Sequence, residues 1–299
     1  MTQKRDIREA VSEQYARAVA TGAGCSGTPE QKGVTAKLAG YDAGELAALP
    51  ADAVVNSFGC GNPLAFSDVQ PGETVLDLGS GAGIDLLLAA EKVGPQGRVI
   101  GVDMTEAMIE RARANAAAAG HTNVDVRRGF IEELPVADGS VDLVISNCVI
   151  NLSPDKSRVF NEIVRVLKPG GRIRIADLVV DDLPDWAREN VALYASCIGG
   201  AISEEAYVRG LEEAGLEQVE VRERLVYDAG QLAALVISDL DESPSTGGCC
   251  AGDTARGGAG DSACGGAGAE AVGDLLRERA GEVAGKVWSA LFVGRKPAD

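Results

Sequence analysis

The sequence predicts an α/β protein built on a doubly wound, mostly parallel sheet. The first observation is the stretch 75–85, VLDLGSGAGID, in which a short apolar run breaks into a glycine-rich turn and a helical pattern follows at once. The second is the alternation of short apolar runs with longer helical patterns along much of the chain. Such alternation is typical of parallel sheets with helices on both faces. Ligands of these sheets bind at the carboxyl ends of the strands.

The N-terminal part is predicted to form helices and loops that cover the site. A helix is expected over 5–20, where apolar residues recur at four-residue spacing. A loop of small and polar residues follows over 21–40 and carries Cys25. Asp42 opens a capping-box pattern ahead of a short helix. A turn-rich linker at 56–63 then leads into the first strand.

The central part is expected to alternate strands with helices. The predicted strands are 75–78, 98–103, 123–128, 141–147 and 172–177. The strand at 141–147 is nearly all apolar at its centre, as a doubly covered parallel strand should be. Between the strands, one helix follows the glycine turn, one is capped by Thr105, and one runs over 154–167.

A C-terminal α+β extension follows the central sheet. Its predicted elements are helices over 184–197 and 203–213 and strands over 216–226 and 286–295. A glycine- and alanine-rich insertion at 243–273 separates the two strands and is expected to be flexible. We therefore divide the chain into an N-terminal segment 1–69, a central domain 70–180 and a C-terminal region 181–299.

Composition argues against several classes of partner. The 299-residue chain carries a formal charge of −17, which would repel nucleic acids and anionic membrane surfaces. No apolar run approaches the roughly 18 residues of a membrane-spanning helix. The polar N-terminus has no signal-peptide core. A cytoplasmic protein is therefore predicted, with its cysteines reduced.

The glycine-rich turn has the chemistry of a nucleotide site. Its glycines let the backbone turn tightly and approach a ligand closely, and the helix that follows favours an anionic group. Asp103 ends the next strand, where a carboxylate can hold two ribose hydroxyls. The dinucleotide fingerprint G-x-G-x-x-G is not met, because Ile84 stands where its third glycine belongs.

The pattern D-x-G-x-G-x-G instead resembles motif I of class I S-adenosylmethionine-dependent methyltransferases. The string LKPGGR at 167–172 resembles that family's usual lead into its fifth strand. The resemblance covers roughly 70–180 and implies a Rossmann-like methyltransferase fold with S-adenosylmethionine as methyl donor. Phe130 and Ile131 resemble the adenine-binding wall, with ordinary core packing as their alternative role. The resemblance to this methyltransferase family implies the following donor-binding residues: Asp77, Gly79, Gly81, Gly83, Asp103, Met104, Phe130, Ile131 and Asn147.

Seven cysteines in a reducing compartment are either inert core residues or carry thiolate chemistry. A conventional zinc site is not indicated, because the chain has no C-x-x-C pair and its one histidine, His121, lies in a predicted turn. Cys60, Cys148 and Cys197 each stand beside a turn or a strand end. Each alone could be structural, but together they point to convergence on one site.

Around these cysteines the sequence is similar to the arsenite methyltransferase family. The matching strings are LAALP at 46–50, GCGNP at 59–63, SNCVINLS at 146–153 and SCIGGA at 196–201. The resemblance implies that Cys60, Cys148 and Cys197 bind trivalent arsenic as thiolates. It also implies arsenite and methylarsenite as substrates, glutathione or thioredoxin as reductant, and thioredoxin as a partner. Cys25 matches the family's further N-terminal cysteine less clearly.

The chemistry agrees with this interpretation. Trivalent arsenic is thiophilic, and soft ions select thiolate ligands. Three thiolates leave the arsenic lone pair on the open side of a pyramidal site, where it can attack the sulfonium methyl in line. Arsenic has no proton to lose, so no general base is needed. The adjacent Cys249 and Cys250, with Cys264 behind them, form a second candidate: a reduced dithiol that captures arsenite and delivers it to the inner site.

Two other functions remain open at this point. A class I methyltransferase of a small organic molecule, such as a quinone, would not need the three cysteines and would usually want a base near its substrate. A non-catalytic arsenic- or metal-binding protein would use the cysteines but would have no use for the donor pocket that motif I and Asp103 predict.

Overall fold

The computed structural model describes residues 7–20, 41–57, 59–64, 69–188, 190, 193–194, 196–227, 279, 282–283 and 285–298. The loop 21–40 and the insertion 243–273 lie outside the described residues, and so do four of the cysteines: Cys25, Cys249, Cys250 and Cys264. The delivery pair therefore stays a prediction.

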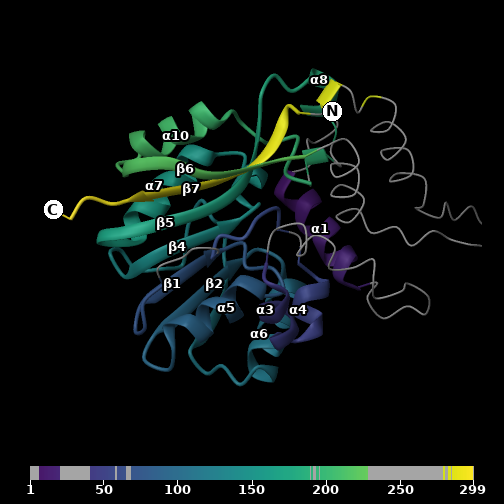
Figure 1. Cartoon of the computed structure of the whole chain (residues 1–299). Helices are drawn as coiled ribbons and strands as arrows, with labels where there is room; N and C mark the ends of the chain where they lie inside the picture. Colours follow the sequence, from purple (N-terminus) through teal and green to yellow (C-terminus); the bar gives the residue numbers. More distant parts are fainter. Residues whose placement is uncertain are drawn as a thin grey trace, which may run out of the picture.

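A seven-stranded sheet forms the centre of the molecule, with strand order β3-β2-β1-β4-β5-β7-β6 (Figure 1). Its strands are β1 (Thr74–Leu78), β2 (Arg98–Asp103), β3 (Val124–Arg128), β4 (Val141–Asn147), β5 (Leu167–Val180), β6 (Glu217–Val226) and β7 (Val287–Arg295). β1 to β5 are parallel, whereas β7 pairs antiparallel with both β5 and β6. This is the mostly parallel, doubly wound sheet that the sequence predicts. The strands of the C-terminal region complete the same sheet.

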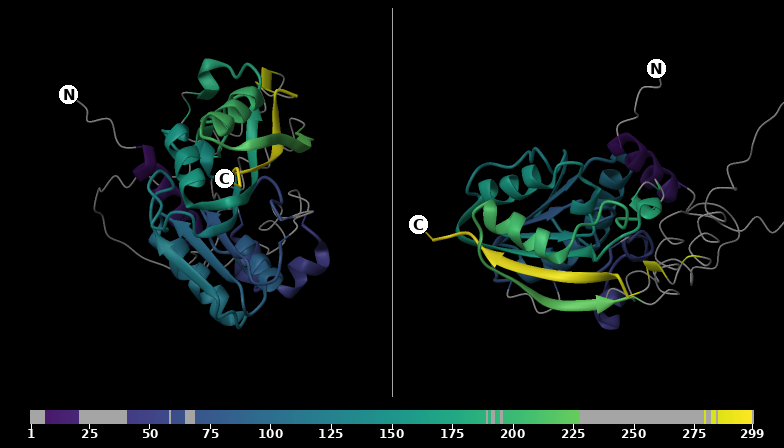
Figure 2. Two further views of the ribbon diagram at one scale, coloured as in Figure 1. Left: turned by 90° about the vertical axis from the view of Figure 1, so that its left-hand side faces the viewer. Right: turned by 90° about the horizontal axis from the view of Figure 1, so that it is seen from above.

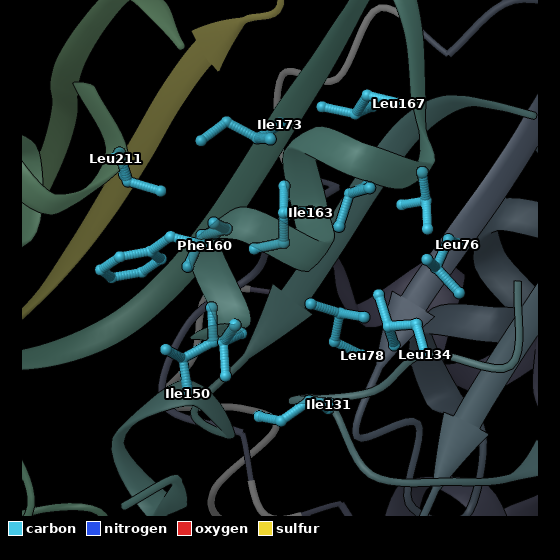
Figure 3. Packing of buried hydrophobic residues seen from close by; sticks show 14 of the residues in the cluster. Leu76, Leu78, Ile131, Leu134, Ile150, Phe160, Ile163, Leu167, Ile173 and Leu211 are labelled. Carbon is cyan, nitrogen blue, oxygen red and sulfur yellow. The ribbon is translucent and has the colours of Figure 1, made fainter. Parts of the chain in front are cut away.

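Helices cover both faces of the sheet (Figures 1 and 2). They are α1 (Ile7–Ala20), α3 (Ala43–Ala48), α4 (Ala51–Val55), α5 (Ile84–Val93), α6 (Glu106–Ala118), α7 (Lys156–Val166), α8 (Asp185–Arg188) and α10 (Glu204–Glu213), with a 3-10 turn η2 (Ile150–Leu152). Leu76 and Leu78 of β1 pack in one core cluster with residues of α7 and α10, and Figure 3 shows them facing Phe160 and Ile163. Val75, one residue away, packs in the cluster of α5 and α6 on the opposite face.

Local sequence signals fix several helix starts. Asp42 caps α3, because its Oδ1 accepts hydrogen bonds from the backbone N–H groups of Gly44 and Glu45 at 2.8 and 3.1 Å. Ser203 caps α10 by accepting from Ala206 N. The helix predicted over 184–197 is shorter, and its described α-helical part includes α8. Residues 196–200 form a turn instead.

The carboxyl ends of the parallel strands are covered by α1. Val11 of this helix is only 1% exposed and belongs to the apolar cluster that contains the described cysteines. Figure 1 shows α1 on the side of the sheet opposite the C-terminus, which lies beside the amino end of β5. No helix in the described part of the chain combines the length and apolarity needed to cross a membrane.

Candidate active site

A cleft opens at the carboxyl ends of β1, β2 and β4. α1 contributes Tyr15 to its wall, and the segment before β1 contributes Gly59. The remaining lining residues are Asn56, Ser57, Asp77, Gly79, Ser80, Gly81, Ala82, Gly83, Ile84, Asp85, Asp103, Thr105, Met108, Asn147, Cys148, Val149 and Leu152. The glycine-rich turn and Asp103 thus line one cleft, as the sequence predicts.

The glycine turn forms the floor of this cleft. Gly79, Gly81 and Gly83 all have positive φ angles, of 66°, 51° and 97°. A Cβ atom on Gly79 would lie 2.3 Å from Val149, so the turn packs directly against the segment after β4. A Cβ on Gly81 would meet nothing within 4 Å. The backbone at Gly81 is therefore open to a ligand.

Asp103 is fixed at the end of β2 by the turn itself. Its Oδ2 accepts a hydrogen bond from Gly81 N at 3.0 Å, and its Oδ1 accepts one from Thr105 N at 2.8 Å. An open glycine turn beside an oriented carboxylate fits the ribose and methionine parts of S-adenosylmethionine.

Three carboxyl groups give the cleft an acidic wall. Burial raises the pKa of Asp77 well above its usual range, and the nearby Asp85 and Asp103 raise it further. Burial also raises the pKa of Asp85 to about 6, and it raises the pKa of Asp103. None of the described residues that line the cleft is lysine, arginine or histidine. The cleft therefore suits a cationic ligand, such as one with sulfonium and ammonium groups.

Three predicted donor-binding residues lie away from the cleft lining. Met104 is partly buried against the cysteine cluster. Ile131 packs in the core under α7, where Figure 3 shows it below Leu78. Phe130 is 48% exposed, and the guanidinium of Arg8 lies 5.1 Å from the centroid of its ring. A contact of these residues with adenine stays a prediction.

Cys60, Cys148 and Cys197 are buried in one apolar cluster, together with residues of α1, β5 and β7. Cys60 and Cys148 form a disulfide with their Cα atoms 5.8 Å apart, whereas the sequence led us to expect reduced thiols. Cys197 lies outside the disulfide, and its Sγ donates a hydrogen bond to the carbonyl oxygen of Cys148 at 2.5 Å. The two segments place the first pair of sulfurs within bonding reach, so reduction must precede any role as thiolates.

The backbone is strained at two of these cysteines. Cys148 and Cys197 have φ angles of 56° and 62°, a left-handed conformation that costs an L-residue about 1–2 kcal/mol. Such strain persists only where the surrounding structure over-determines the conformation, and it is found most often at functional sites. Close packing surrounds the Cys197 turn: a Cβ on Gly200, three residues later, would lie 2.1 Å from the carbonyl oxygen of Asn151.

Asp177, in the carboxyl-terminal part of β5, is a site residue that the sequence analysis missed. It is fully buried, and one of its oxygens lies within 4.8 Å of the sulfurs of Cys60 and Cys148. The two carboxylate oxygens accept hydrogen bonds from four donors: Asn151 N and Nδ2, Leu178 N, and Tyr207 OH. Burial raises the pKa of Asp177 to about 7. Asp177 ends the predicted fifth strand, so the rule that sites form at strand ends was the available signal.

Comparisons with known proteins identify similar sequences and folds. A family model described as a methyltransferase domain matches residues 70–215. The arsenite methyltransferase of Halobacterium salinarum is 46% identical over 230 residues, which are 72% of this chain and 59% of that protein. The arsenite methyltransferase of Aquipseudomonas alcaligenes is also 46% identical, over 48% of this chain and 44% of that protein. The chain thus spans about half the length of these curated relatives.

One solved structure is similar over more of its length. The crystal structure of the arsenic(III) S-adenosylmethionine methyltransferase from Chlamydomonas reinhardtii matches with a TM-score of 0.63 and 31% identity. The match covers 85% of this chain and 73% of that one.

Proposed function

Because the chain belongs to the arsenite methyltransferase family, we propose that it transfers methyl groups from S-adenosylmethionine to trivalent arsenic. Arsenite and methylarsenite are the substrates, and Cys60, Cys148 and Cys197 hold the arsenic as thiolates. The products are methylated arsenicals, and the role of the reaction is arsenic detoxification.

The position of Cys148 carries this proposal. It lines the cleft that contains the glycine turn and Asp103, and it also belongs to the buried cluster of Cys60 and Cys197. One residue therefore borders both the donor cleft and the thiol cluster. An arsenic atom held by its sulfur would lie beside the donor cleft, and positioning of this kind accelerates a bimolecular transfer strongly.

In the donor cleft, S-adenosylmethionine supplies an electrophilic methyl group. The open turn at Gly81 receives its methionine part, and the carboxylate of Asp103 accepts hydrogen bonds from the ribose. The buried carboxyls of Asp77 and Asp85 favour its positive charges. The cleft residues thus bind and orient the donor without general acid–base chemistry.

At the thiol site, arsenite exchanges three hydroxyl groups for three sulfurs, and the three thiol protons leave in three molecules of water. The arsenic lone pair then forms the As–C bond as the donor's S–CH3 bond breaks. Loss of two sulfur ligands as a disulfide returns an electron pair to arsenic, while a water molecule takes the vacated position and releases a proton. Cys60–Cys148 is a pair within bonding reach. Glutathione or thioredoxin then reduces this disulfide, which makes an external thiol a co-substrate.

The test is to incubate the reduced protein with arsenite, glutathione and S-adenosylmethionine and to identify the arsenic species by chromatography. Methylated arsenic is expected from the wild type. Cys148→Ser and Cys197→Ser should each abolish methylation of both substrates, because a hydroxyl is a poor ligand for arsenic. Cys60→Ser should lose arsenite methylation but keep that of methylarsenite, in which carbon already fills one valence. Full activity of Cys148→Ser would exclude the three-thiolate site.

A cytoplasmic location, in which thioredoxin is available, is part of the same proposal. The net charge of −17 and the acidic cleft favour small-molecule substrates over nucleic acids or membrane surfaces.

A further inference from the structure

The side chain of Asn147 lies between the two cysteine segments and has all its polar atoms engaged. Its Oδ1 accepts hydrogen bonds from the backbone N–H groups of Cys60 and Gly61, at 3.0 and 3.2 Å. Its Nδ2 donates to the carbonyl oxygen of Gly61 at 2.7 Å, to Tyr41 OH at 2.9 Å and to Asp85 Oδ2 at 3.2 Å. An amide has two N–H donors, so three acceptors share them. Asn147 lines the donor cleft, but all of these hydrogen bonds are to other residues of the chain.

From this arrangement we propose that Asn147 is a positioning residue that sets where Cys60 stands relative to Cys148. Asn147 is the last residue of β4, directly before Cys148 in the chain. Its amide oxygen accepts a hydrogen bond from the backbone N–H of Cys60, which is 87 residues away in sequence. One side chain therefore ties the backbone of one arsenic ligand to that of the other.

The packing around this contact leaves little freedom. A Cβ on Gly59 would lie 2.3 Å from Nδ2 of Asn147, so the backbone before Cys60 packs directly against the amide. On the other side of the segment, Tyr227 OH donates to the carbonyl oxygen of Cys60 at 2.7 Å. Cys60 is thus held from two directions, and Asn147 provides the contact on the side of β4.

A shorter or purely apolar residue at 147 would leave the N–H of Cys60 without its acceptor. The segment would then sample positions in which its sulfur lies farther from Cys148. The effective concentration of one sulfur at the other would fall, and this concentration controls both the disulfide and the chelation of a single arsenic atom. The role in chelation rests on the proposed function, whereas the role in disulfide formation does not.

The first test measures the disulfide directly. Wild type and Asn147→Ala are equilibrated in glutathione buffers of known ratio, and the Cys60–Cys148 bond is quantified by alkylation and peptide mass spectrometry. Loss of the two hydrogen bonds to the segment should lower the equilibrium constant for the disulfide about tenfold. Asn62→Ala is the matched control, because Asn62 lies in the same segment and accepts only from Leu64 N among the bonds seen at its side chain. It should stay within twofold of wild type.

Gly59→Ala probes the same contact from the other segment, because its methyl group would displace the amide. It should also weaken the disulfide, and it serves as the test if Asn147→Ala does not fold. A disulfide equilibrium within twofold of wild type in a folded Asn147→Ala or Gly59→Ala variant would overturn the proposal. A lower melting temperature with an unchanged equilibrium would mark a purely structural role and would overturn it too.

The second test compares substrates. Asn147→Ala should reproduce the selectivity of Cys60→Ser, with arsenite methylation reduced at least tenfold more than methylarsenite methylation. If Cys60→Ser shows that selectivity and Asn147→Ala reduces both rates equally, positioning by Asn147 is wrong and the proposed function stands. If Cys60→Ser itself methylates arsenite normally, the three-thiolate function fails, and the disulfide equilibrium alone decides the role of Asn147.

Discussion

Asp103 combines two tasks in one carboxylate. Its carboxylate accepts hydrogen bonds from the backbone N–H groups of Gly81 and Thr105, and these bonds shape the glycine turn. It also lines the cleft where the donor's ribose is proposed to bind. Both tasks require the ionised form, although burial raises its pKa. The turn and the donor therefore depend on the same charge.

We predict that Asp103→Ala weakens S-adenosylmethionine binding by roughly 1.5–3 kcal/mol, the range for hydrogen bonds to a charged group. Arsenite binding should persist, since Asp103 is not a member of the cysteine cluster. Calorimetric titration of both ligands measures the two effects. Equal donor affinity in the variant and the wild type would show that Asp103 does not hold the ribose.

At the scale of elements, α1 joins the two halves of the site. Val11 belongs to the cysteine cluster, Tyr15 lines the donor cleft, and the hydroxyl of Ser12 is hydrogen-bonded to that of Thr105 at 3.3 Å. Among the described elements, the principal packing partner of α1 is α6. Its stability should therefore depend on what the cleft contains.

We predict that saturating S-adenosylmethionine slows hydrogen exchange in α1 several-fold, because a bound ligand stabilises the elements it touches. Deuterium uptake followed by peptide mass spectrometry measures this, with α10 as an internal reference on the far side of the core. Uptake in α1 that does not change with donor, while the glycine turn becomes protected, would show that α1 does not cover the donor.

At the scale of the whole molecule, the chain is acidic, and three of its carboxyl groups, Asp77, Asp85 and Asp103, line the buried cleft. Burial raises the pKa of Asp85 to about 6, so this group loses its charge as the pH falls through that value. A cationic donor prefers the ionised form, and binding it lowers the pKa of the carboxyl. Binding therefore releases protons near pH 6, and affinity should fall as the pH falls.

The expected result is a loss of donor affinity between pH 8 and pH 5.5, with a limiting slope of about tenfold per pH unit for each proton released. Titration calorimetry in buffers of different ionisation enthalpy measures both the affinity and the proton release. Asp85→Asn should bind more weakly at pH 8 but with a flatter dependence on pH. An affinity that is constant over this range would contradict the electrostatic role of the acidic wall.

The proposed delivery pair also acts on the whole molecule. If Cys249 and Cys250, with Cys264 behind them, capture arsenite, replacing all three with serine should raise the apparent KM for arsenite and leave the maximal rate nearly unchanged. A tethered dithiol raises the local concentration of substrate, which matters only when substrate is scarce. Methylation rates over a range of arsenite at fixed glutathione test this. Superimposable curves would leave the insertion as a linker.

The sequence by itself determined the features that depend on neighbours along the chain. β2 and β4 lie where their apolar runs predict them, at Arg98–Asp103 and Val141–Asn147. Asp42 caps α3 as its capping-box pattern predicts. The positive φ angles of the glycine turn follow from residue type. Strand periodicity, turn chemistry and helix capping depend on residues close together in the chain, so the sequence alone predicts the structures that they produce.

Only the tertiary structure decided which distant groups meet. It placed Cys60 against Cys148, inserted β7 antiparallel between β5 and β6, and buried Asp177 beneath the disulfide. It also turned the amide of Asn147 toward the Cys60 segment, where the sequence indicated a donor-binding residue. These contacts join segments that lie tens of residues apart. They form because burial of the apolar surface around them offsets the entropy of bringing those segments together, and no local pattern in the sequence encodes that balance.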